Sequence, residues 1–230
     1  GPPMAEGSFS VDGRLLVAST PPIRRVVVVD RAERAPHAPL ASVDESRAYG
    51  LGHFTADGFA LAAVGDGLSG LFDIESGIPL ARATAPRGAP RQAASDARRL
   101  AVTTDQELVV FDLTDFQVSV RLPGSFGPVA FANGQVLFGA GTTVRQLDPS
   151  GASTVWAELP EEDPERPPLV TALRVQGGTV WIGTAHGLWS APAGSGPVAA
   201  RLRLRTGYGA VHAIAPEGRR VWIGTGSLIP

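Results

Sequence analysis

The chain has 230 residues, of which 43% are apolar and 18% charged, and its net charge is -2. This balance is typical of a packed globular protein and excludes a disordered chain or a protein that binds nucleic acid through a broad basic surface. Because there is no cysteine, disulfides, thiolate metal sites and cysteine nucleophiles are excluded as well.

The first residues, Gly1 to Pro3, precede a methionine and resemble what a cleaved expression tag leaves behind. We therefore expect one domain over residues 4–230. No apolar run approaches the roughly 20 residues of a membrane-spanning helix, and the longest aliphatic stretch, Val26 to Val29, suits a buried strand. We expect no membrane association and a cytoplasmic location.

A turn followed by an apolar strand recurs six times along the chain. The strand positions that align are Leu16, Leu61, Leu100, Val136, Val180 and Val221, which are 45, 39, 36, 44 and 41 residues apart. A second marker keeps the same period, since an apolar residue followed by aspartate ends the next strand at Asp30, Asp73, Asp112 and Asp148. Two markers with one period of about 40 residues indicate a repeat architecture.

Each repeat has room for about four short strands, rich in Val, Leu, Phe and Trp and bounded by turn residues. No long segment has helical periodicity, so the fold class that we predict is all-β. Many strands are continuous apolar runs, as expected when sheets stack face to face and bury both sides.

Short stretches also resemble known propeller repeats. The sequence from Phe72 to Ala81 resembles the end of a WD-type repeat, and the stretches that begin at Val180 and Val221 resemble the repeat of two-component-regulator sensor propellers. The resemblance implies a β-propeller of five complete four-stranded blades plus an abbreviated sixth. The expected blades cover residues 8–40, 51–86, 91–124, 128–160, 169–205 and, in part, 210–230.

The abbreviated sixth blade has two strands and the beginning of a third. We expect it to close the ring within one chain, which predicts a monomer. The alternative is a dimer in which a second copy pairs with the open strand edge.

The sequence lacks the residue sets of propeller enzymes. It has a single asparagine, Asn133, no Gly-x-Ser-x-Gly motif and no pair of histidines at metal-binding spacing. We therefore predict no catalytic residue, metal or cofactor. His53 and His212 occupy matching places in the first strand of two blades, where a hydrogen-bonded structural role and ligand contact at a central channel mouth are both open.

The links between blades are expected on one face, and several combine arginine with an aromatic residue. This is the composition of protein-interface hot spots. The predicted contact residues are Arg47, Tyr49, Arg91, Phe126 and Tyr208. The alternative is that these arginines are ordinary solvated side chains and that the aromatic rings are packed.

The sequence thus predicts a non-catalytic protein-interaction or sensory module. The regulator-like repeat and the use of arginine without any lysine suggest that it is part of a larger bacterial regulatory protein. A propeller enzyme or small-ligand receptor that uses the channel mouth is the alternative function. No nucleic-acid partner is expected, although Arg201, Arg203 and Arg205 alternate along one strand.

Overall fold

The computed structural model describes residues 6–20, 25–40, 49–65, 68–160, 167–194, 196–207, 209–218 and 220–226. These residues form twenty-three strands and one short 3-10 helix, η1 (Ala38–Leu40), and they contain no α-helix. The all-β prediction is therefore confirmed. The chain divides into two compact units, Pro2–Ser125 and Phe126–Pro230, called the first and second unit below.

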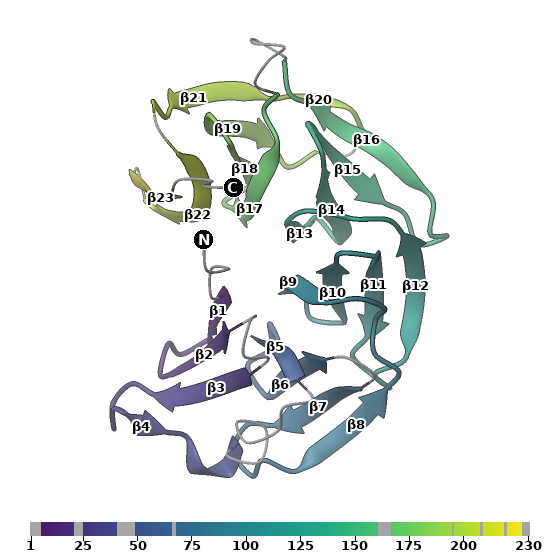
Figure 1. Cartoon of the computed structure of the whole chain (residues 1–230), viewed down its shortest axis with the longest axis vertical. Helices are drawn as coiled ribbons and strands as arrows, with labels where there is room; N and C mark the ends of the chain where they lie inside the picture. Colours follow the sequence, from purple (N-terminus) through teal and green to yellow (C-terminus); the bar gives the residue numbers. More distant parts are fainter. Residues whose placement is uncertain are drawn as a thin grey trace. The chain divides into compact units, whose positions relative to one another are not determined.

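The first unit contains three antiparallel four-stranded sheets, and in each sheet the strands lie in chain order (Figure 1). The first sheet consists of β1 (Glu6–Phe9), β2 (Leu15–Thr20), β3 (Arg25–Asp30) and β4 (Ala35–Pro36). The second consists of β5 (Tyr49–Phe54), β6 (Ala60–Gly65), β7 (Ser69–Asp73) and β8 (Pro79–Ala83). The third consists of β9 (Pro90–Ser95), β10 (Arg99–Thr104), β11 (Glu107–Asp112) and β12 (Val118–Pro123).

The second unit contains three more sheets. The fourth sheet consists of β13 (Val129–Ala132), β14 (Gln135–Ala140), β15 (Thr143–Leu147), β16 (Ser153–Glu158) and β20 (Val198–Ala199). The fifth consists of β17 (Val170–Gln176), β18 (Thr179–Thr184), β19 (Gly187–Pro192) and β21 (Arg201–Arg205), and the sixth of β22 (Ala210–Glu217) and β23 (Arg220–Gly226).

The end of the fifth repeat differs from the expected pattern. The apolar stretch Val198 to Leu204 predicts one outer strand, but the structure divides this segment into β20 and β21. β20 pairs in parallel with β16 of the fourth sheet, and β21 completes the fifth sheet as an antiparallel strand. The chain thus adds a strand to the preceding sheet before it finishes its own.

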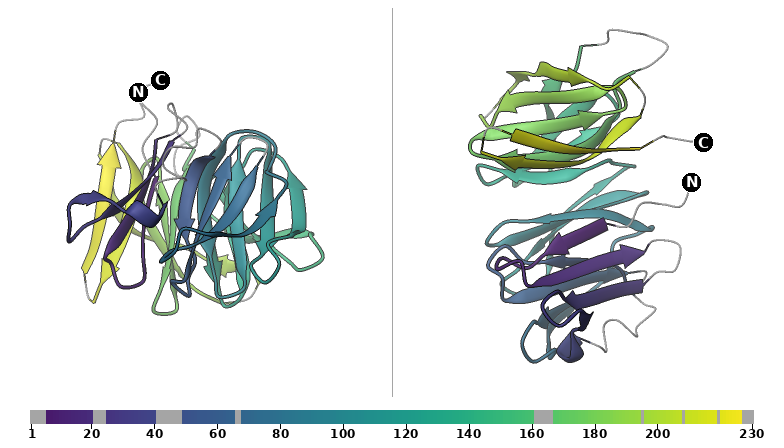
Figure 2. Two further views of the ribbon diagram at one scale, coloured as in Figure 1. Left: turned by 90° about the horizontal axis from the view of Figure 1, so that it is seen from below. Right: turned by 90° about the vertical axis from the view of Figure 1, so that its left-hand side faces the viewer.

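The second sheet explains why strands in this protein are continuous apolar runs. Along β6, Leu61 and Ala63 pack with Val17 of the first sheet, whereas Ala62 and Val64 pack with Val102 of the third sheet. Successive side chains of a strand point to opposite faces, so a strand buried on both sides needs an apolar residue at every position. Figure 2 shows these sheets lying face to face within the first unit.

Gly52 of β5 sets how closely the first two sheets approach. A Cβ atom at this position would lie 2.5 Å from Cγ2 of Val17 and 2.7 Å from Cγ1 of Val26. Both distances are shorter than real carbon contacts, so the packing of these valines requires glycine.

Both markers of the repeat contain a hydrogen-bonded turn. At the end of the third strand of their sheets, Asp30 accepts hydrogen bonds from the N–H groups of Ala32 and Glu33, and Asp112 accepts one from the N–H of Thr114. Asp73 and Asp148 do the same for Ser76 and Ser150. The aspartates of the first turn, Asp12, Asp57 and Asp96, cap the backbone two residues further on. The period of the sequence is therefore a period of hydrogen-bonded turns.

Candidate interaction surfaces

The predicted contact residues on the links occupy different environments. Arg47 and Tyr208 lie outside the described residues. Arg91 of β9 is exposed, and its Nη1 atom donates a hydrogen bond to the hydroxyl of Ser125 at 3.4 Å. Its role in partner binding stays a prediction.

For Tyr49 the structure agrees with the alternative of a packed ring. Only 5% of this residue is exposed, and its ring packs edge to face against Phe72 with centroids 5.7 Å apart. Burial raises the pKa of the Tyr49 hydroxyl. Phe126 belongs to the second unit, is partly exposed, and packs edge to face against the buried Phe138 at 4.9 Å. Tyr49 and Phe126 thus have packing roles in separate units.

The two histidines of interest also belong to different units. His53 in β5 and His212 in β22 are both partly buried. A Cβ atom at Gly226 would lie 3.3 Å from Cδ2 of His212, so this ring rests against the end of β23. Ligand contact by either ring stays a prediction.

A polar cluster that the sequence analysis missed fixes the link between β8 and β9. The buried Glu107 carboxylate accepts hydrogen bonds from the backbone N–H of Arg87 at 2.6 Å and from Nη1 of Arg121 at 2.5 Å. Thr104 donates its hydroxyl to the carbonyl of Arg87 at 2.7 Å. The sequence signal for this cluster is Glu107, an acidic residue at the start of the apolar run that forms β11.

In the first and second sheets, the turns that follow β1 and β5 carry large exposed apolar side chains. The exposed fractions are 56% for Phe9, 71% for Val11 and 74% for Phe59. Val11 lies beside the neighbouring turn, because a Cβ atom at Gly58 would be 3.1 Å from its Cγ2 atom. The β1–β2 and β5–β6 turns therefore present these side chains next to each other.

A cation adjoins this apolar group. The Arg31 guanidinium lies over the Phe9 ring, with Cζ 5.4 Å from the ring centroid, and its Nη1 donates to the carbonyl of Gly13 at 2.8 Å. We call Phe9, Val11, Arg31 and Phe59 the turn surface.

Phe59 differs in residue type from the equivalent position of the other repeats. Two residues before the aligned strand position, where this repeat has Phe59, the other repeats have arginine or glycine: Arg14, Arg98, Gly134, Gly178 and Arg219. A phenylalanine that is three-quarters exposed on a turn gains little from burial, so the stability of the fold does not account for it. An exposed phenylalanine at this position of the repeat is therefore the feature of the sequence that could have indicated the turn surface.

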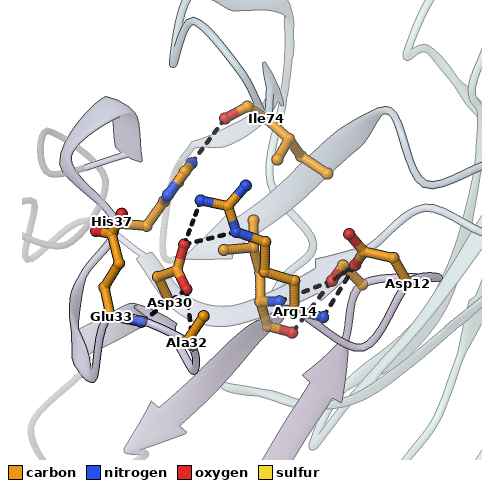
Figure 3. A network of polar contacts seen from close by, with 9 residues as sticks. Asp12, Arg14, Asp30, Ala32, Glu33, His37 and Ile74 are labelled. Atoms are coloured by element: carbon orange, nitrogen blue, oxygen red, sulfur yellow. Dashed lines mark hydrogen bonds and ion pairs between the residues drawn. The ribbon is translucent and has the colours of Figure 1, made fainter.

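An ion pair holds the neighbouring turns of the first sheet in place (Figure 3). The Arg14 guanidinium binds the buried Asp30 carboxylate through Nε at 2.7 Å and Nη2 at 2.6 Å. The hydrogen bond from Arg14 lowers the pKa of Asp30, and the same contact raises the pKa of Arg14. Nε2 of His37 lies 3.0 Å from the carbonyl oxygen of Ile74, which ties the first sheet to the second. The turn surface is thus presented on a fixed backbone.

Among the residues that the structure describes, no group of three His, Cys, Asp or Glu side chains is placed to hold a metal ion. The same residues include no helix with the length and apolar character needed to cross a membrane.

No protein-family model matches the chain, and no curated protein matches it. Solved structures do resemble it. The computationally designed Ika8 protein is 15% identical, with a TM-score of 0.66 over 95% of this chain and 67% of that one. The hydrazine synthase of Kuenenia stuttgartiensis is 14% identical, with a TM-score of 0.60 over 81% of this chain and 64% of that one. The chain thus spans about two thirds of the length of each, and what it shares with them is the fold, an all-β arrangement of small antiparallel sheets consistent with a β-propeller-like architecture.

Proposed function

We propose that this chain is a non-catalytic protein-interaction module, built as a β-propeller of five complete blades and an abbreviated sixth. The six sheets in chain order support the propeller, since each sheet of a propeller is one repeat of the sequence. The resemblance of two repeats to sensor propellers favours a place in a larger bacterial regulatory protein.

The observation that carries the proposal is the turn surface, with Phe59 at its most exposed point. Aromatic and arginine side chains are enriched in interface hot spots, and they bind best where the partner shields them from water. Because the Arg14–Asp30 ion pair and the capped turns fix the backbone, a partner would have to order little of it on binding.

The turn surface and the β8–β9 link lie at opposite ends of the strands of the first unit, because each sheet is antiparallel with its strands in chain order. Arg91, which lies in β9 directly after that link, remains a proposed contact, as do Arg47, Phe126 and Tyr208 near the other links. Variants at the two ends can therefore separate the two hypotheses.

The test is affinity capture with the immobilised chain, followed by measured binding of the purified partner. We expect the double variant Val11→Arg, Phe59→Arg to lose at least about tenfold in affinity, because both side chains would bring charge into an apolar contact. The matched control is Arg91→Ala, which should bind within about threefold of the wild type if the turn surface alone makes the contact.

Melting temperatures of all variants should agree closely, since the replaced side chains are exposed. Full binding by the double variant would exclude the turn surface. Loss of binding by Arg91→Ala alone would move the contact to the links.

A further inference from the structure

The end of the first unit that carries the turn surface has an excess of negative charge. It contains six turns, because each of the three sheets has one turn between its first and second strands and one between its third and fourth strands. With the residues that flank them, these turns span residues 10–14, 30–34, 55–59, 73–78, 96–99 and 112–117. Together they contain nine carboxylates and five arginines, which gives this end a net charge of -4.

Two of these carboxylates border the exposed apolar side chains. Asp12 follows Val11 in the first turn, and Asp57 lies two residues before Phe59 in the second. In both turns, Oδ1 of the aspartate accepts a hydrogen bond from the hydroxyl two residues earlier, at 2.5 Å, and another from the backbone N–H two residues later. Within the described residues, Oδ2 of each aspartate accepts no hydrogen bond. Each turn thus holds one oxygen in place and leaves the other available to a partner.

The cation of the turn surface lies on the other face of the first sheet. Phe9 pairs with Leu16, and the residues on either side of Leu16 in β2, Leu15 and Val17, pack with the second sheet. Because successive side chains of a strand point to opposite faces, Phe9 and the Arg31 guanidinium over its ring lie away from the second sheet. A partner that contacts the β5–β6 turn therefore meets carboxylates rather than this cation.

The turn surface does not depend on where the chain begins or ends. All six turns lie within the described residues, and any chain before β1 joins this strand at its opposite end. The last described strand, β23, belongs to the second unit. The charge around the turn surface then indicates which kind of protein segment complements it.

We propose that the turn surface binds an extended protein segment in which a large apolar side chain is flanked by arginine or lysine. This inference rests on the proposed function, because it names the chemistry of the partner for the same surface. The apolar side chain of the partner packs against Val11 and Phe59, and its cations pair with Oδ2 of Asp12 and Asp57. The net charge of -4 at this end disfavours anionic lipid surfaces and nucleic acids, which carry the same sign.

The probes are three labelled peptides of about nine residues, in which leucine alternates with arginine, glutamine or glutamate. Their binding to the whole chain is followed by fluorescence anisotropy in about 20 mM salt, where screening of exposed charges is weak. We expect saturable binding of the arginine peptide, at least about fivefold weaker binding of the glutamine peptide, and none of the glutamate peptide. The Val11→Arg, Phe59→Arg variant should not bind the arginine peptide.

The decisive variant is Asp12→Asn, Asp57→Asn, which keeps the side-chain oxygen that caps each turn and removes both charges. It should bind the arginine peptide at least about fivefold more weakly than the wild type. The matched control is Asp105→Asn at the β8–β9 link. Asp105 is also exposed, and its Oδ1 accepts from the N–H of Ala89 at 2.9 Å, but it lies at the opposite end of the strands. This control should bind within about twofold of the wild type.

Equal binding of the three peptides, or unchanged binding by Asp12→Asn, Asp57→Asn, would overturn the inference. The proposed function would survive that result if the captured partner still required Val11 and Phe59. Preferential binding of the glutamate peptide would also overturn it, because Arg31 would then select the partner. Full binding of the captured partner by Val11→Arg, Phe59→Arg would remove the proposed function, and this inference with it.

Discussion

Replacement of Glu107 tests whether one buried carboxylate holds the β8–β9 link in place. Glu107→Ala removes the acceptor for the Arg121 guanidinium, which is partly exposed, and this loss costs about 1 kcal/mol. It also leaves the N–H of Arg87 without its acceptor, which adds about 1–2 kcal/mol. We therefore expect the free energy of unfolding to fall by about 2–3 kcal/mol, measured by urea denaturation monitored by circular dichroism.

Two matched variants divide this effect between the partners. Glu107→Gln keeps an oxygen that can accept from Arg87 and loses only the charge, so it should cost about 1 kcal/mol. Arg121→Ala should cost about the same. If Glu107→Gln is as destabilising as Glu107→Ala, or if Glu107→Ala changes the unfolding free energy by less than about 0.5 kcal/mol, the carboxylate does not organise the link as argued.

Three further predictions concern packing and pH. Gly52→Ala should destabilise the fold by about 1–3 kcal/mol in urea denaturation because its methyl group would overlap Val17 and Val26, whereas Gly207→Ala, in open space, should have little effect. Trp156→Phe should cost about 1–2 kcal/mol in the same assay, because the fully buried indole donates Nε1–H to the carbonyl of Gly194 at 2.9 Å. Hydrogen bonds hold the pKa values of the turn carboxyls Asp12, Asp30, Asp73, Asp112 and Asp148 below the ordinary 3.8. Their stabilisation is therefore present above about pH 4 and is lost as the pH falls through the folded-state values, so the melting temperature should decline below about pH 4, and a flat profile down to about pH 2.5 would contradict this.

The sequence was sufficient for the all-β class and for the positions of the sheets. Strand positions follow from local chemistry, because the aspartates that cap the turns and the apolar runs that must be buried can both be identified in the amino-acid sequence. The parallel pairing of β20 with β16 was not visible, because a two-residue strand has no pattern of its own and is defined by the neighbour that it meets.

The candidate sites were less predictable. Tyr49 and Phe59 are both aromatic residues beside a turn, yet the structure buries the first and exposes the second. Local sequence does not distinguish them, because burial depends on whether another part of the chain, here Phe72, lies against the ring. Comparison with the aligned repeats would have singled out Phe59, which stands where the other repeats have arginine or glycine.

The sequence by itself thus determined the repeat, the turn chemistry and the two-sided burial of the inner strands, all of which arise from residues close together in the chain. Only the tertiary structure decided how the two identical Val-Trp-Ile-Gly-Thr strands, residues 180–184 in β18 and 221–225 in β23, are paired: within the described residues β18 has a strand on each edge and β23 pairs with β22 alone. The physical reason is that strand pairing and the removal of apolar side chains from water depend on strands from elsewhere in the chain, so the same five residues are interior in β18 and peripheral in β23.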